Sequence, residues 1–468
     1  MPEREIVVIG GGPGGYVAAI QAAQLGGKVT LIEKDELGGI CLNWGCIPTK
    51  ALLRGVELLE LLEGSKDFGI HVGEVSVDFS KLMARKDRAV KSLVSGVSGL
   101  MKSNGIEVMK GKARLISPQN IEVIDEKQQK LALGARKIIL ATGSVSADLP
   151  ISGASLPGVI DSSGALQLTA VPESLVIIGA GPIGLEFGTI FAALGAKVTI
   201  LEMLPQILPT EDPEVASSLD KSLRRFKIQT LTGCQVKEIG EGAGGKRKVV
   251  AITGEGEKAF EAQYVLVAVG RKPNVEGLGL PEAGVRFTKK GIEINEKLET
   301  NVPGIYAIGD VTGQWLLAHF AMAQGEVAAK NALGQEAHMD SRVVPRCVYT
   351  LPEVAAVGLT EKQAKDAGYE LKVGRFPFAA NGKATVLGER SGLVKIVAET
   401  KYDEILGIHI FGPHATDLIG EGVLAMRLEG TAPDIAQAIH PHPTLTEAMM
   451  EAALDVDGRA VHIPPRKK

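Results

Sequence analysis

The feature that most constrains the fold is a glycine-rich segment that occurs twice. Residues 6–34 read IVVIGGGPGGYVAAIQAAQLGGKVTLIEK, and residues 175–203 read LVIIGAGPIGLEFGTIFAALGAKVTILEM. Each copy contains a short apolar run, a glycine turn, a helical stretch, a second apolar run and a glutamate. This order predicts a strand–helix–strand unit with parallel strands. We therefore expect an α/β protein in which one domain type is used twice.

The glycines of each copy follow the spacing G-x-G-x-x-G, which is typical of dinucleotide-binding loops. The first glycine makes a tight turn, the second lets a pyrophosphate approach the backbone, and the third lets the helix pack closely. The helix N-terminus then favours the anion. The two copies supply Gly10, Gly12 and Gly15, and Gly179, Gly181 and Gly184. They predict two bound dinucleotides.

A glutamate ends the second apolar run of each copy. Glu33 and Glu202 are placed to accept a hydrogen bond from a ribose 2′-hydroxyl. No Lys or Arg occurs between Glu202 and position 220. A 2′-phosphate would therefore be repelled and would find no cation, so the second site is predicted to prefer NAD to NADP.

Three further apolar runs end beside the expected ligands. Residues 137–143 (KIILATG) end at Gly143 and residues 264–270 (YVLVAVG) end at Gly270. Residues 304–310 (GIYAIGD) end in Asp310, whose carboxylate could face a sugar-like hydroxyl or cap the helix expected from about Ala318. Glycine-rich residues 240–245 are interpreted as the tip of a hairpin.

The segment GGICLNWGCIPTK at residues 38–50 carries the most informative chemistry. Cys41 and Cys46 have no second Cys or His pair nearby that would complete a zinc site. A disulfide needs Cα atoms within about 7 Å, which a distorted turn at Gly45 could provide. A sulfur pair at a helix start favours redox activity. The alternative is a pair of buried free thiols.

Composition narrows the class of protein. Apolar residues form 45% and charged residues 23% of the 468 residues, as in globular proteins of about three domains. We expect no membrane span and no signal peptide. The net charge of −4, with only residues 466–468 locally basic, argues against nucleic acid as the main partner. Four cysteines are too few for a secreted disulfide framework, so a cytoplasmic location is expected, with Cys234 and Cys347 in the core.

Together these motifs resemble the pyridine nucleotide–disulfide oxidoreductases over essentially the whole chain. The resemblance also uses ATG at 141–143, GRKPN at 270–274, AIGD at 307–310 and HPHPTLTE at 440–447. Trp44 departs from the family, which more often has a small aliphatic residue there. The resemblance implies an FAD-binding domain at 1–147, an NAD-binding domain at 148–272, a central domain that completes the FAD site at 273–344, and an α+β C-terminal dimerisation domain at 345–468.

The resemblance also implies roles around the cysteines. Cys41 and Cys46 would form a redox disulfide, in which Cys41 meets the substrate and Cys46 faces the flavin. Lys50 would lie near the reactive edge of the flavin and pair with Glu186. The flavin contacts implied are Gly10, Gly12, Gly15, Glu33, Lys50, Thr142, Gly143, Asp310 and Ala318, and those of NAD are Gly179, Gly181, Gly184, Glu202 and Gly270.

The expected base is His442, which would come from the partner subunit of a homodimer. Histidine can remove a thiol proton near neutral pH. Glu447, near the start of a helix expected from about Leu445, would fix the tautomer of the imidazole. His71, His338, His409, His414 and His462 are expected to be surface or core residues without a site.

The implied reaction is oxidation of a protein-bound dihydrolipoyl group with NAD⁺ to a lipoyl group and NADH. The implied partners are the lipoyl domains and acyltransferase core of a 2-oxo acid dehydrogenase complex, or a glycine-cleavage carrier protein; no metal is expected. Three alternatives stay open. A glutathione or trypanothione reductase would normally use NADPH, which Glu202 disfavours, and a mercuric reductase needs a further cysteine pair, which is absent after Cys347. The third is a non-catalytic assembly or adhesion role.

Overall fold

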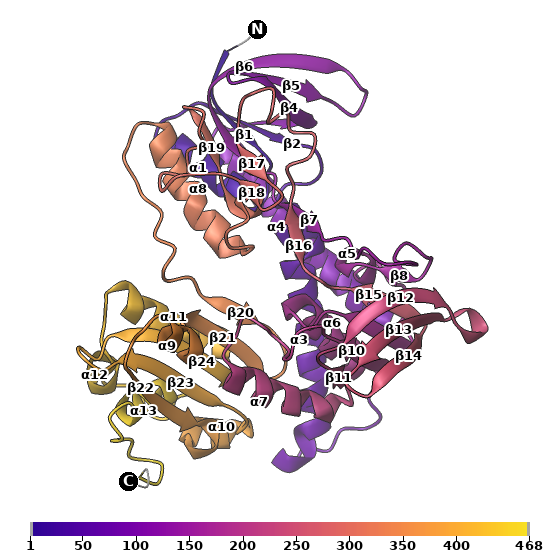
Figure 1. The fold of residues 1–468 in the computed structure, drawn as a ribbon, viewed down its shortest axis with the longest axis vertical. Coiled ribbons are helices and arrows are strands. Elements are labelled where there is room, and N and C mark those ends of the chain that lie inside the picture. The colour runs from indigo at the N-terminus through magenta and orange to yellow at the C-terminus, as the bar shows by residue number, and fades with distance from the viewer. Residues whose placement is uncertain (1–2, 466–468) are drawn as a thin grey trace.

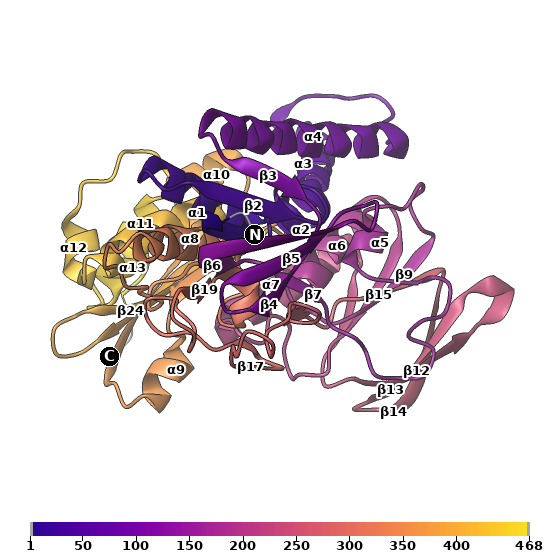
Figure 2. The same cartoon turned by 90° about the horizontal axis from the view of Figure 1, so that it is seen from above.

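The computed structural model describes residues 3–465 and consists of three sheet-centred parts with connecting segments (Figures 1 and 2). The basic tail noted in the sequence, residues 466–468, lies outside the described residues. Both glycine-rich units fold as the predicted strand–helix–strand. The first consists of β1 (Glu3–Ile9), α1 (Pro13–Gln24) and β2 (Val29–Glu33), and the second of β9 (Ser174–Ile178), α6 (Pro182–Ala193) and β10 (Lys197–Leu201). The mixed α/β class expected from the sequence is confirmed.

The first sheet has the strand order β3-β2-β1-β6-β5-β4, and β19 also pairs with β6. The strands that carry the nucleotide motifs, β1, β2, β6 and β19, run parallel, whereas β4 and β5 form an antiparallel extension. The strands are β1 (Glu3–Ile9), β2 (Val29–Glu33), β3 (Glu107–Lys110), β4 (Lys112–Ser117), β5 (Asn120–Ile124), β6 (Lys130–Leu140) and β19 (Ile305–Ala307).

Helices α1 (Pro13–Gln24) and α8 (Ala318–Ala332) pack against each other beside this sheet. Their backbones approach closely, because a Cβ atom on Gly325 would lie 2.7 Å from the carbonyl oxygen of Gly14. The long helix α4 (Phe79–Ser103) lies on the outside next to α3 (Cys46–Glu63), as Figure 2 shows. Asp78 caps α4 by accepting from the backbone amide of Lys81.

The second sheet is parallel, with the order β11-β10-β9-β15-β8. Its strands are β8 (Val159–Ile160), β9 (Ser174–Ile178), β10 (Lys197–Leu201), β11 (Gln229–Leu231) and β15 (Tyr264–Val267), with helices α5 (Ser162–Ala165), α6 (Pro182–Ala193) and α7 (Pro213–Leu223). An antiparallel meander of β12 (Gln235–Glu241), β13 (Arg247–Thr253) and β14 (Gly256–Ala262) extends this part. The glycines at 240–245 lie at its first hairpin, as predicted.

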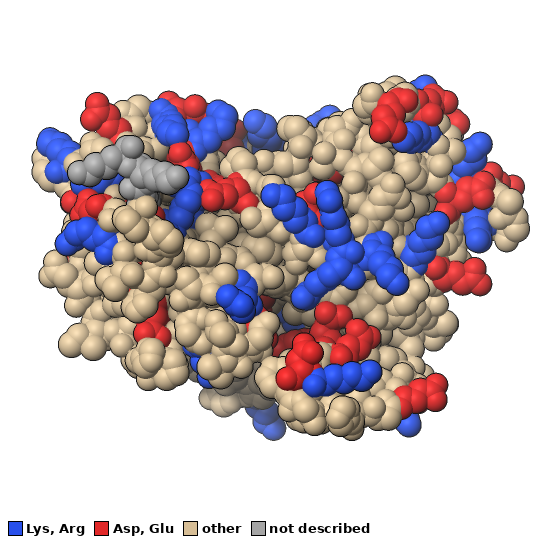
Figure 3. Space-filling view, turned by 90° about the horizontal axis from the view of Figure 1, so that it is seen from below, with Lys and Arg blue, Asp and Glu red and all other residues tan. Residues whose placement is uncertain are grey.

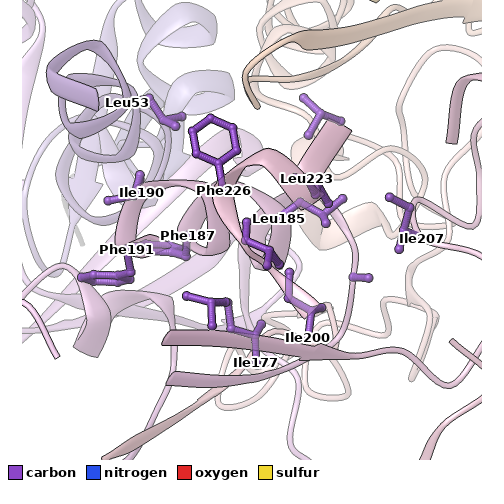
Figure 4. Close-up of a cluster of buried hydrophobic side chains, with 14 of the residues drawn as sticks. Leu53, Ile177, Leu185, Phe187, Ile190, Phe191, Ile200, Ile207, Leu223 and Phe226 are labelled. Carbon is purple, nitrogen blue, oxygen red and sulfur yellow. The ribbon is translucent and has the colours of Figure 1, made fainter. Parts of the chain in front are cut away.

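The core of the second part reaches into the first. Figure 4 shows Leu53 of α3 and Phe226 beside the side chains of α6, with Ile177 and Ile200 below them on β9 and β10. All of these side chains belong to one buried apolar cluster. Burial of such side chains contributes roughly 1.5–3 kcal/mol each, so this cluster fixes α3 against α6.

The third part is an antiparallel sheet with the order β20-β21-β24-β23-β22, covered by helices. Helix α11 packs on β21 and β24, and α13 packs on β22 and β23. The elements are β20 (Arg346–Val348), β21 (Glu353–Gly358), β22 (Leu371–Pro377), β23 (Leu393–Glu399), β24 (Ile405–Gly412), α9 (Glu361–Asp366), α10 (Gly382–Leu387), α11 (Ala415–Arg427), α12 (Ala432–Gln437) and α13 (Glu447–Asp455).

A two-stranded ribbon marks where the chain passes between the first two sheets. β7 (Ser144–Ser146) leads toward the second sheet, and its partner β16 (Arg271–Pro273) returns from it. The second sheet is therefore an insertion in the part that carries the first glycine loop. The short pair β17 (Phe287–Thr288) and β18 (Gly291–Ile292) follows before β19.

The surface carries charges of both signs. Figure 3 shows a band of Lys and Arg side chains across one face, with acidic side chains on either side of it. Among residues 3–465, no helix has the length and apolar character that crossing a bilayer requires.

Candidate functional site

Backbone crowding dictates two of the three glycines in the first loop. A Cβ atom on Gly15 would lie 1.8 Å from the carbonyl oxygen of Gly10, and Gly10 itself has φ +105°. By contrast, the nearest atom to a Cβ on Gly12 would be 3.9 Å away. The loop is thus tightly packed on the sheet side and open at the N-terminus of α1, which is where a pyrophosphate would bind.

The second loop repeats this arrangement. A Cβ on Gly184 would lie 2.0 Å from the carbonyl oxygen of Gly179, whereas no atom lies within 4 Å of a Cβ on Gly181. Gly143 and Gly270 have positive φ values and are equally open. Both loops therefore leave room for a ligand at the same place relative to strand and helix.

The two glutamates are buried and bind the backbone of their own loops. Glu33 accepts from the amide of Gly11 at 2.6 Å, and Glu202 accepts from the amide of Ala180 at 2.7 Å. The second oxygen of Glu202 accepts from Leu204. Each carboxylate oxygen keeps a free lone pair, so a ribose hydroxyl could still bind.

Asp310 lies in a polar chain that the sequence analysis did not find. Its Oδ2 atom accepts from the Ser144 hydroxyl at 2.5 Å, and Arg271 Nε donates to that hydroxyl at 2.8 Å. Burial raises the pKa of Asp310, opposed by the bond from Ser144 and the charge of Arg271. The alternative role of Asp310 as a cap of α8 is wrong, because Leu317 occupies the N-cap position.

Helix α2 (Gly39–Trp44) ends at Trp44 and α3 begins at Cys46, so Gly45 separates the two helices. Gly45 has φ −143° and ψ −103°, so the helix is interrupted at the residue where a distortion was predicted. Cys41 lies within α2. The break brings the two thiols into contact, although a regular helix would direct residues five apart away from each other.

Both cysteines are free thiols in the structure, which is the reduced state of the redox pair that the resemblance implies. The Cys41 thiol donates a hydrogen bond to the Cys46 sulfur. It lowers the pKa of Cys46 to about 7, against the effect of burial and with help from the charge of Lys50. The same contact, together with burial, raises the pKa of Cys41. Of the two thiols, Cys46 is therefore the one that loses its proton more readily.

Lys50 and Glu186 meet, as the resemblance implied. Lys50 Nζ lies 2.7 Å from Glu186 Oε2 and 2.9 Å from Oε1. Glu186 also accepts from the backbone amide of Tyr349 at 3.0 Å, and the Tyr349 ring centre lies 4.5 Å from Lys50 Nζ. Tyr349 was not identified from the sequence, because it follows β20 and nothing local marks it.

His442 and Glu447 also meet, with Nδ1 2.8 Å from Oε1. The second oxygen of Glu447 accepts from the amide of Thr444, so the carboxylate is fixed from both sides. The His442 side chain is 78% exposed. No hydrogen bond or ion pair within residues 3–465 joins this dyad to Cys41 or Cys46.

His462, expected to be a surface or core residue without a site, has a side chain that is 68% exposed. His462 Nδ1 lies 2.7 Å from the carboxylate of Glu451, which is buried and one turn after Glu447 on α13. His409, by contrast, is fully buried, as expected for a core residue.

The comparisons with known proteins cover the same parts of the chain. The family model described as "Pyridine nucleotide-disulphide oxidoreductase" matches residues 4–325, and the dimerisation domain of that family matches residues 344–453. The chain belongs to the pyridine nucleotide–disulphide oxidoreductases. The cofactors of this oxidoreductase family are FAD and NAD.

Curated relatives of this oxidoreductase match over nearly its full length. It is 45% identical over 467 residues to a dihydrolipoyl dehydrogenase of Thermus scotoductus, with 99% of both chains covered. It is 42% identical to a dihydrolipoyl dehydrogenase of Bacillus subtilis, and the match covers 98% of this chain and 99% of the relative. It is also 42% identical to a mitochondrial dihydrolipoyl dehydrogenase of Pisum sativum, and that match covers 98% of this chain and 93% of the relative.

Among solved structures, this oxidoreductase is similar to the HOCl-induced flavoprotein disulfide reductase RclA of Escherichia coli in its Cu(II) complex. The TM-score is 0.86 at 28% identity, with 97% of this chain and 99% of the other covered. The copper belongs to that protein. Within residues 3–465 of the present chain, no group of three or more His, Cys, Asp or Glu side chains could hold a metal ion.

Proposed function

We propose that this oxidoreductase oxidises protein-bound dihydrolipoyl groups with NAD⁺, giving lipoyl groups and NADH. We base this on Cys46, which begins α3 with a pKa lowered to about 7 and lies near Cys41 and Lys50. Relatives that are 41–45% identical carry the name dihydrolipoyl dehydrogenase. The first reaction is thiol–disulfide exchange.

In that exchange a substrate thiolate attacks Sγ of Cys41 in the oxidised Cys41–Cys46 pair. The Cys41–Cys46 bond breaks, a mixed disulfide forms between the substrate and Cys41, and Cys46 leaves as a thiolate. The lowered pKa of Cys46 makes it the better leaving group. The second substrate thiol then attacks the first substrate sulfur and releases Cys41. Two electrons have now moved from the substrate to the cysteine pair.

The proton of the attacking thiol needs an acceptor. We assign this role to His442 of the partner subunit, because His442 and Glu447 lie on the dimerisation domain and the imidazole is exposed. The carboxylate of Glu447 at Nδ1 leaves Nε2 as the atom that takes the proton. The site is thereby completed in a homodimer.

The first loop fits FAD, since it is open at Gly12 and has Glu33 and Asp310 nearby for hydroxyl groups. When bound, FAD supplies the two-electron transfer between the cysteine pair and NAD⁺. Lys50 is held by Glu186 at the start of α3 and places a positive charge beside the Cys46 thiolate. Glu202 orients the ribose at the second loop.

The proposed partners are the lipoyl domains and acyltransferase core of a 2-oxo acid dehydrogenase complex, or the carrier protein of a glycine-cleavage system. The names of the relatives support a dihydrolipoyl substrate. We propose a cytoplasmic location, because four cysteines in 468 residues are few for an oxidising compartment.

Steady-state assays test the proposed function. The purified protein should be yellow and should reduce NAD⁺ with dihydrolipoamide far faster than it reduces glutathione disulfide with NADPH. Turnover with glutathione disulfide and NADPH alone would instead identify a glutathione reductase. A colourless protein without either activity would indicate an assembly role.

A further inference from the structure

Lys395 is a buried cation that joins the dimerisation domain to the NAD-binding part. Its side chain, on β23, is 3% exposed. Its Nζ atom lies 3.0 Å from both carboxylate oxygens of Asp212 and 3.2 Å from Glu214, which belong to the start of α7. It also lies 2.9 Å from Glu361 of α9. The positive charge of Lys395 therefore binds carboxylates of both the NAD-binding part and the C-terminal part of the chain.

A second buried pair lies one residue earlier. Glu211 binds Arg346 of β20 through both oxygens, at 2.8 Å and 3.2 Å, and both side chains are largely buried. Two consecutive acids that precede α7 are thus each held by a cation of the C-terminal sheet. Figure 1 shows α7 on the side of the second sheet that faces the C-terminal sheet.

These acids end the segment that lines the second glycine loop. Residues 203–211 connect Glu202, the glutamate proposed to orient the ribose, to Asp212. In this segment the amide of Leu208 donates to the carbonyl oxygen of Ala180 in the loop, at 2.9 Å. Gln206 donates to the carbonyl oxygens of Leu208 and Glu211. A shift at Glu211 or Asp212 would therefore reach the loop through three hydrogen bonds.

We infer that Lys395 and Arg346 are positioning residues for NAD, which hold segment 203–211 and through it the adenosine side of the NAD site. This rests on the proposed NAD site at the second loop. Asp212 is fully buried and caps α7, so without Lys395 its carboxylate must move or be protonated. Either change displaces the start of α7 and the segment before it.

The Lys395→Met holoenzyme tests this inference. We expect the Kd of ADP-ribose, measured by titration calorimetry, and the KM for NAD⁺ to rise roughly 2- to 30-fold, the usual range for coupling between sites. The rate at which dihydrolipoamide reduces the bound flavin without NAD⁺ should not change, since no hydrogen bond or ion pair described within residues 3–465 joins segment 203–211 to Cys41 or Cys46. A general loss of structure would instead weaken the binding of ADP-ribose and also lower the rate of flavin reduction.

Lys372→Met is the matched control. Lys372 lies on the neighbouring strand β22 and forms two salt bridges, with Asp403 and Asp457, that stay within the C-terminal part. The Lys372→Met substitution should leave the Kd of ADP-ribose unchanged. If Lys395→Met does not fold, Arg346→Gln tests the same connection from Glu211 and should raise the same Kd.

Two outcomes are distinguishable. If the unmodified protein binds ADP-ribose and a folded Lys395→Met or Arg346→Gln variant binds it equally well, the inference is wrong and the cations only join the domains. If the unmodified protein does not bind ADP-ribose, the NAD site itself is wrongly placed.

Discussion

Nζ of Lys50 lies 2.7 Å from Oε2 of Glu186, and this ion pair joins the helix that begins at Cys46 to the helix that follows the second glycine loop. Lys50 is one turn after Cys46, so its charge acts on the thiol. Glu186 is 5% exposed and is itself held by Tyr349. The pair therefore fixes α3 against α6 and determines the charge beside the Cys46 sulfur.

The first prediction concerns the pKa of Cys46. Lys50 lowers this pKa and Glu186 raises it. Lys50→Met should therefore shift the pH midpoint of Cys46 alkylation upward from about 7, and Glu186→Gln should shift it downward. The measurement is the rate of iodoacetamide reaction of the reduced protein against pH.

Glu57→Gln, which breaks an exposed ion pair with Arg54 on the same helix, is the control and should leave the midpoint unchanged. Shifts of the same sign in Lys50→Met and Glu186→Gln would contradict the electrostatic account.

The second prediction distinguishes the two sulfurs. In the FAD-loaded protein, two-electron reduction should give a long-wavelength thiolate-to-flavin absorption band. Cys46→Ser should abolish this band, and Cys41→Ser should keep a thiolate beside the flavin. A Cys46→Ser protein that retains the band would show that the roles of the sulfurs are exchanged.

The third prediction concerns the choice of nucleotide. Glu202→Gln removes the charge but keeps an oxygen that can accept from Ala180, so the loop should stay in place. The ratio of kcat/KM for NAD to kcat/KM for NADP should fall. The additional substitution Met203→Arg should lower this ratio further. Met203 is 67% exposed and can carry that side chain. Equal use of both nucleotides by the unmodified protein is the result that excludes a role for Glu202.

The fourth prediction concerns the dimer. His442→Gln should lower turnover roughly 10²- to 10⁴-fold by removing the base, while FAD and NAD still bind. Cys46→Ser inactivates the other half of the site. In a hybrid dimer of these two variants one site carries both changes and the other carries none, so activity should reappear. Each variant homodimer, purified in the same way, is the control. An inactive, folded hybrid would mean that each site is completed within one chain.

The local parts of the fold follow from the sequence, because neighbouring residues determine them. The glycine spacing predicts both strand–helix–strand units. The spacing of the two cysteines predicts the break at Gly45, because a straight helix would keep their sulfurs apart. The meeting of Lys50 with Glu186 depends on two helices packed through a shared core, and only the family resemblance indicated it.

The remaining contacts join residues that are distant in sequence and carry no local signal. Lys395 and Asp212 are 183 residues apart, and neither a strand lysine nor a capping aspartate indicates its partner. Ser144 and Asp310 are likewise brought together only by the pairing of β19 with β6. Such placements arise from tertiary packing, which periodicity and spacing do not encode.

The close crossing of α1 and α8 at Gly14 and Gly325 has a consequence for synthesis on the ribosome. The first glycine loop emerges early, but the helix that packs against it, and the strand β19 beside β6, emerge only after the whole second sheet has been made. The inserted second sheet has all its strands within one stretch of chain and can fold first. Stable retention of FAD should therefore require nascent chains that extend beyond residue 332, however early the loop itself is translated.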